Sequence, residues 1–223
     1  MSLPSIETPD GDVAGGTRSV FLRKAAVGSG AVLTSGAIMG MLPELAAAKP
    51  SKKQDLAILN FALTLEYLEA AFYKGAVDGG TLTGDAAAFA SLVAAHEATH
   101  VSALKKTIRS LGGKPVKSPE FDFMGTNTDP AKFVDTAFVL ENTGVHAYLG
   151  QAGRLKSKAL LAAAASIVTI EARHAAAIAA IKATSPYADK SDFGITPDGA
   201  FDVPFSKHKV LKAVKGTGFI KES

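Results

Sequence analysis

The chain has 223 residues, 47% of them apolar, which is enough for one domain with a substantial core plus an extension. It contains no cysteine, which excludes disulfides, thiolate metal sites and iron–sulfur clusters. The formal net charge is +3 and the lysines and arginines form no dense run, so we do not expect nucleic acid as a partner.

Residues 1–48 have the pattern of an export signal. A basic segment from Thr17 to Lys24 precedes an apolar stretch with glycine and serine, and three alanines at 46–48 supply a small-residue cleavage site. The basic segment resembles a twin-arginine signal, with Arg18 in the first arginine position but Ser19 where the second arginine is expected. We therefore expect export to the periplasm or the cell exterior and no stable membrane span in the mature chain. A retained membrane anchor is the alternative.

The rest of the chain contains four stretches in which apolar residues recur every three or four positions, which predicts four amphipathic helices. The stretches are residues 55–76, 85–111, 131–155 and 158–184. Helix stop and start signals stand between them, namely Gly79-Gly80, Thr83 or Asp85, Gly112-Gly113, Asp129-Pro130 and Ser157. Since the first two helices are joined by a short connection, they should be antiparallel neighbours.

Residues 114–128 show no period and contain proline, glycine, asparagine and aspartate. This segment is too long for a tight turn and suits a crossover that runs the length of a bundle. We therefore predict an all-α fold, a four-helix bundle over residues 49–184 with a long crossover between its second and third helices. Residues 185–223 should form a mostly irregular tail that packs over one end of the bundle, with one short helix at 206–215.

The pattern Glu-x-x-His occurs twice in the predicted helices, and a lone glutamate precedes each copy on the helix before it. Residues three apart share a helix face, so each glutamate and its histidine point the same way. A bundle of these helices brings together four carboxylates and two imidazoles, the ligand set of carboxylate-bridged two-metal proteins. The predicted metal ligands are Glu66, Glu97, His100, Glu141, Glu171 and His174.

Two divalent cations would remove the repulsion among four buried carboxylates. Oxygen-rich ligands with one nitrogen per metal suit iron or manganese, and we expect two ions, with iron favoured. The alternative is that these residues belong to solvated helix surfaces. Against it, the predicted helices contain only five glutamates, and four of them fit the pattern.

Several neighbouring side chains are weaker candidates. Glu69 lies one turn after Glu66. It is either a ligand in place of Glu66, a neighbour of the ligands or a surface residue. His96 is rotated by about 100° from the ligand face and should be solvated or at an interface. His146 also lies off that face. Tyr73 and Tyr148 each follow a predicted glutamate ligand by seven residues and are core residues with a bonded hydroxyl or redox partners.

Four stretches resemble the ferritin-like superfamily, namely LNFALTLEYLEAAFY, HEATHVSALKK, FVLENTGVHAYLGQA and ASIVTIEARHAA. More narrowly, the chain is similar to exported bacterial ferritin-like domain proteins related to desiccation-associated proteins, over about residues 54–183. The resemblance implies a ferritin-like bundle and metal binding by the same six residues.

Three functions fit these observations. A di-iron, ferroxidase-like oxidase would use oxygen or peroxide, and a dimanganese protein similar to manganese catalases would disproportionate peroxide. A non-catalytic, stress- or desiccation-associated bundle would use the metal pair to hold its helices together. We rank the first and third ahead of the second. The sequence leaves open whether the protein is an enzyme and whether it forms a homodimer.

Overall fold

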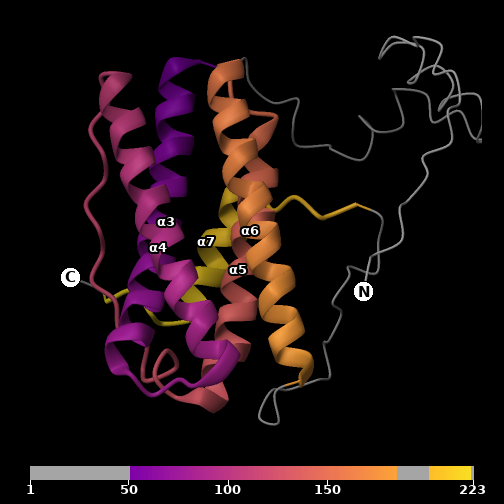
Figure 1. The fold of residues 1–223 in the computed structure, drawn as a ribbon. Coiled ribbons are helices and arrows are strands. Elements are labelled where there is room, and N and C mark those ends of the chain that lie inside the picture. The colour runs from indigo at the N-terminus through magenta and orange to yellow at the C-terminus, as the bar shows by residue number, and fades with distance from the viewer. Residues whose placement is uncertain (1–50, 185–200, 222–223) are drawn as a thin grey trace, which may run out of the picture. The chain divides into compact units, whose positions relative to one another are not determined.

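The computed structural model describes residues 51–184 and 201–221 of the chain. Four long helices form a bundle, and one short helix packs on it (Figure 1). The helices are α3 (Lys52–Gly79), α4 (Gly84–Ser110), α5 (Pro130–Ala152), α6 (Lys158–Thr184) and α7 (Lys207–Gly216). The predicted all-α four-helix fold is confirmed. The predicted export signal at 1–48 and tail residues 185–200 lie outside the described residues.

The bundle consists of two helix pairs, α3 with α4 and α5 with α6. The pairs meet through α3 against α5 and α4 against α6. Gln54, at the start of α3, donates its side-chain N–H to the carbonyl of Arg154, just past the end of α5, at 2.7 Å. Helices α3 and α5 are therefore antiparallel, as are the two members of each pair (Figure 1).

The segment between α4 and α5 is the predicted crossover, which runs the length of the bundle (Figure 1) and bonds to α3. At its start, the backbone N–H of Val116 donates to the side chain of Asn60 at 2.8 Å. Near its end, Asn127 donates to the carbonyl of Phe72 at 3.4 Å. This path lets the second helix pair begin at the end of the bundle where α3 ends, so that α5 runs antiparallel to α3.

The described part of the tail packs along one side of the bundle rather than over one end. The backbone N–H of Phe205 donates to the carbonyl of His146 in α5 at 3.0 Å. The predicted short helix is present as α7, where Ser206 accepts from the N–H of Lys209 and Val210 is fully buried. The physical reason is that this amphipathic helix has an apolar face, which the flank of α5 covers.

Two apolar clusters fill the interior on either side of a layer of buried charged residues. On α4, Val93 belongs to one cluster and Leu104 to the other, with Glu97 between them. On α6, Ile178 and Ile167 belong to these clusters in the same way. The fold thus places a polar layer halfway along the helices and closes it above and below with apolar side chains.

Helices α3 and α6 are long and apolar enough to cross a membrane by length and composition alone. This is weak evidence for a span, because the core helices of soluble proteins pass the same test. In the described part of the chain both helices instead contribute buried charged residues to the polar layer.

One contact that the sequence did not predict joins the starts of two helices. Asp55 in α3 is buried, and its carboxylate accepts from the backbone N–H groups of Lys156 at 2.8 Å and Ser157 at 3.3 Å. Ser157 caps α6 as predicted, by accepting from the N–H of Leu160. Helix α5 ends at Ala152, three residues earlier than expected, because the backbone that follows bonds to α3 instead.

Replacing Asp55 by alanine should therefore lower the free energy of unfolding by about 1–2 kcal/mol, since two backbone donors would lose a buried acceptor. Asp78, exposed at the other end of α3 in a surface pair with Lys74, provides a matched control. Asp78→Ala should cost at most about 0.5 kcal/mol. Denaturation in urea measures both, and equal effects would contradict the role given to Asp55.

Candidate metal centre

All six predicted ligands meet in the polar layer, together with Glu69. Helices α3, α4 and α6 contribute two residues each, and α5 contributes one. The four predicted glutamate ligands are fully buried, and both histidines are less than 10% exposed. The interpretation of these residues as a solvated surface is therefore wrong. We call the seven residues the cluster: Glu66, Glu69, Glu97, His100, Glu141, Glu171 and His174.

The first half of the cluster surrounds the imidazole of His100. Its Nδ1 atom lies 3.2 Å from Oε2 of Glu66, 3.1 Å from Oε2 of Glu97 and 3.0 Å from Oε1 of Glu171. These three carboxylates come from three different helices. An ion held near this nitrogen would therefore bind α3, α4 and α6 together.

The second half surrounds His174 in the same manner. Its Nδ1 atom lies 3.3 Å from Oε1 of Glu97, 3.3 Å from Oε2 of Glu141 and 3.6 Å from Oε2 of Glu171. Glu97 and Glu171 thus turn one oxygen toward each histidine, whereas Glu141 serves only His174. The arrangement has two centres that share two carboxylates.

Several of the inward-facing atoms have no well-aligned hydrogen bond within the described structure. They are Oε2 of Glu66, Oε1 of Glu97, Oε2 of Glu141, both oxygens of Glu171 and Nδ1 of His174. Buried polar atoms are normally satisfied, so these atoms need a partner that the chain itself does not supply. Carboxylate oxygens with one imidazole nitrogen on each side are suitable donors for metal ions. The residues present therefore fit a metal site.

Two tyrosines hold the outer oxygens of the cluster, and they do so crosswise. Tyr148 donates to Oε1 of Glu66, and Tyr73 donates to Oε1 of Glu141. Each tyrosine therefore bonds the glutamate of the other helix pair, not the one seven residues before it. Burial and the neighbouring carboxylates raise the pKa of both tyrosines well above the usual value, so both stay protonated donors.

Glu69 is buried, so the surface alternative for this residue is wrong. One of its oxygens lies within 4.8 Å of ligand atoms of Glu141 and Glu171, a third group that could hold a metal ion. The absent side chain of Gly144 makes room for it, because a Cβ there would lie 3.1 Å from Oε1 of Glu69. The sequence signal was the spacing of three from Glu66, which places both residues on one face.

His96 lies at an interface, which is the second of the two positions expected for it. It is half-buried rather than solvated, and its Nδ1 atom lies 2.9 Å from Nε2 of His174, with the two rings stacked 5.1 Å apart. The contact joins α4 to α6, so no pattern within one helix could have indicated it. His146 lies outside the cluster, where it stacks on Phe205 of the tail, 4.3 Å between ring centres.

Burial dominates the electrostatics of the carboxylates. It raises the pKa of Glu66 and Glu69 well above the usual value, and it raises the pKa of Glu141 to about 8 although His174 opposes this. Burial acts in the same direction on Glu97, but its contacts with His100 and His174 outweigh it and lower the pKa of Glu97 to about 2.

Burial acts in the opposite direction on the pKa values of the two imidazoles. Burial would lower their pKa values, yet the surrounding carboxylates outweigh it and raise the pKa of His100 to about 12 and of His174 to about 11. Without cations the cluster therefore keeps protons on its histidines and on some of its acids. These protons compete with any metal ion for the same atoms.

Sequence comparison adds one decisive observation. Residues 54–184 match the family model of the ferritin-like domain. The chain belongs to the ferritin-like domain family. The match spans α4, α5, α6 and nearly all of α3, and includes every residue of the cluster. No protein of curated function matches the chain. The ferritin-like resemblance is thus confirmed, while the narrower likeness to exported, desiccation-associated proteins stays a prediction.

In this ferritin-like domain, His96 should position a metal ligand. If Nδ1 of His174 binds metal, its proton must be on Nε2, where Nδ1 of His96 accepts it and fixes the ring. His96→Ala should weaken metal binding by about ten- to a hundredfold, as measured by competition with a chelating dye. His208→Ala, at an exposed position of α7, is the control and should have no effect. Equal affinity in both variants would contradict this role.

Metal should also invert the pH dependence of stability. Without metal, the folded pKa values of His100, His174 and Glu141 are about 12, 11 and 8, above the ordinary 6.5 for histidine and 4.5 for glutamate. The folded state then binds more protons than the unfolded chain between pH 6.5 and 8, so stability should fall as pH rises. With metal bound, protons are competitors and stability should rise. Urea denaturation with and without chelator tests this, and slopes of the same sign would contradict it.

Proposed function

We propose that this protein is an exported ferritin-like protein that binds two metal ions, namely iron, at the cluster, and that it oxidises ferrous iron or activates oxygen or peroxide. The observation that carries the proposal is the sharing of Glu97 and Glu171, each of which offers one oxygen to either histidine. Carboxylates shared in this way are the usual bridges between two metal ions about 3.5–4 Å apart.

The composition of the cluster supports iron, with manganese as the alternative. Five carboxylates and two imidazoles form a hard, oxygen-rich set with one nitrogen for each ion. Under this proposal Glu66 and His100 hold one ion, Glu141 and His174 hold the other, and Glu69 adds a further carboxylate beside the second. A bound iron pair would supply the electrons for reducing oxygen or peroxide.

The residues around the ions prepare the site for this chemistry. Tyr73 and Tyr148 hold the outer glutamates in position through their hydroxyl groups. The two apolar clusters exclude bulk water from above and below, which strengthens the interactions between ions and carboxylates. His96, half-buried, connects Nε2 of His174 to the outside and can pass a proton there.

Export forms part of the proposal and is supported only by the signal pattern of residues 1–48. A twin-arginine route would suit a protein that folds around its metal before it crosses the membrane. Comparison of the mass of the protein in the periplasmic fraction with that of the full chain would test both export and cleavage.

Ferrous iron added to the metal-free protein in air tests the function. The wild type should bind about two ions per chain by elemental analysis and consume oxygen, because both centres are complete. Glu97→Gln should reduce the rate at least tenfold, since one bridge loses its charge. Glu120→Gln, at an exposed position of the crossover, is the matched control and should retain the wild-type rate.

A wild-type rate no higher than that of Glu97→Gln would overturn the oxidase proposal. Two bound ions without turnover would then favour the structural, stress-associated alternative. Oxygen release from peroxide by the manganese-loaded protein would favour the catalase-like alternative.

A further inference from the structure

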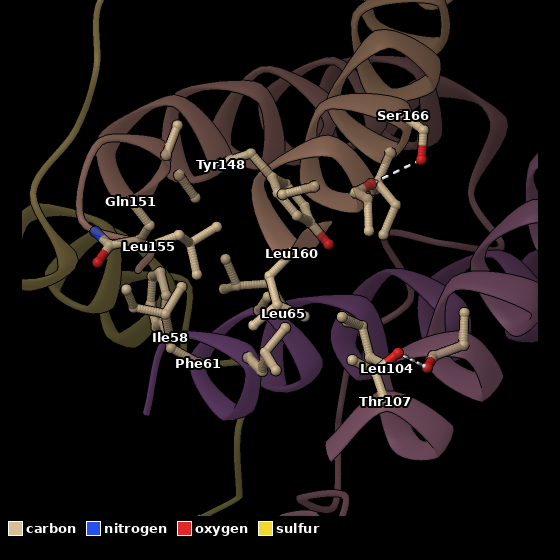
Figure 2. Close-up of a pocket in the computed structure, with 18 residues that line it drawn as sticks. Ile58, Phe61, Leu65, Leu104, Thr107, Tyr148, Gln151, Leu155, Leu160 and Ser166 are labelled. Carbon is tan, nitrogen blue, oxygen red and sulfur yellow. Dashed lines mark hydrogen bonds between the residues drawn. The ribbon is translucent and has the colours of Figure 1, made fainter. Parts of the chain in front are cut away.

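An apolar cavity of about 140 Å³ lies next to the cluster, between all four long helices. It occupies the end of the bundle where α3 begins and α5 ends (Figure 2). Its walls are mainly aliphatic, with Ile58, Leu65, Leu104, Leu160 and Ile167 among them. An apolar cavity of similar volume in another protein stays dry and takes up benzene.

The walls exclude a charged occupant. None of the described residues that line the cavity is a lysine, arginine, histidine, aspartate or glutamate. The hydroxyls of Thr107 and Ser166 donate to carbonyls of their own helices, and that of Tyr148 donates to Glu66 (Figure 2 shows the first two bonds). The hydroxyl donors are therefore already used, and the cavity offers mainly apolar contact.

The cavity adjoins the cluster on α3, α4 and α6. On α4, Leu104 lies one turn after His100, and on α6, Ile167 lies one turn before Glu171. One helical turn corresponds to a rise of about 5.4 Å. On α3, Leu65 directly precedes a cluster residue. An occupant of the cavity would therefore lie within one or two turns of the shared carboxylates.

Tyr148 belongs to both sites. Its ring forms part of the cavity wall, at the centre of the lining residues in Figure 2, and its hydroxyl holds Glu66. A molecule that packs against this ring touches the side chain that positions a predicted metal ligand. The matching tyrosine of the first helix pair has different surroundings, because Tyr73 is fully buried among Phe72, Phe89 and Phe133.

We propose that this cavity binds an uncharged, apolar organic molecule the size of one aromatic ring or a short alkyl chain, held against Tyr148 beside the metal centre. Binding itself follows from the cavity. The role of this molecule as the organic substrate or regulator of the centre rests on the function proposed above.

Toluene is a suitable probe for the full-length protein, with its proton resonances followed by NMR. Saturable binding is expected both with and without metal. Ala163 lines the cavity and is exposed on α6, so Ala163→Phe should block the opening without disturbing the core, and should weaken binding at least tenfold. Ala162→Phe, at the adjacent exposed position outside the lining, should bind as the wild type does.

Ala103→Phe provides a second block from α4, also at an exposed lining position, should the first variant fold poorly. In the manganese-loaded protein, bound toluene should show strong paramagnetic broadening, because the cavity adjoins the centre. Absence of saturable binding to the metal-free wild type, or unchanged binding in both blocked variants, would overturn the cavity proposal. Failure of the protein to bind two metal ions would count against the proposed function. It would not affect the result for toluene binding to the metal-free protein.

Discussion

Five carboxylates and two imidazoles share the bundle interior, and compensation of their charge is the constraint on which the rest depends. Isolated buried charges are costly, so the cluster persists only because protons or cations stand between the acids. Glu97 and Glu171 do most to join the halves, since each contacts both histidines. The apolar clusters on either side keep water from taking over this role.

The helix order serves this arrangement. Because the crossover carries the chain along α3 before α5 begins, α3 and α5 run antiparallel and their glutamates meet from opposite directions. The same geometry lets Tyr148 reach Glu66 and Tyr73 reach Glu141. Neither helix pair can build its half of the cluster alone, since each relies on a tyrosine and a carboxylate from the other pair. The cluster is therefore complete only where the two helix pairs pack together.

The helices, the crossover and the meeting of six residues could be predicted because they follow from local periodicity and from spacings of three along single helices. Contacts that depend on how one helix is rotated against another could not. His96 reaches His174 across the interface of α4 and α6, and Asp55 caps a helix that begins about a hundred residues later. The position of the tail could not be predicted either, because nothing in its sequence states which helix its apolar face will meet.

The two Glu-x-x-His patterns and the glutamates that precede them make the two halves of the cluster alike in ligands, but their surroundings differ. The half around His100 adjoins the apolar cavity through Tyr148, whereas the half around His174 adjoins His96, which is partly open to solvent. Metal ions bound in the two halves would consequently be inequivalent. They would differ in their rates of exchange with ions in solution and in their reduction potentials. The two halves of the cluster therefore share Glu97 and Glu171, yet one half borders an apolar cavity and the other borders a half-buried histidine.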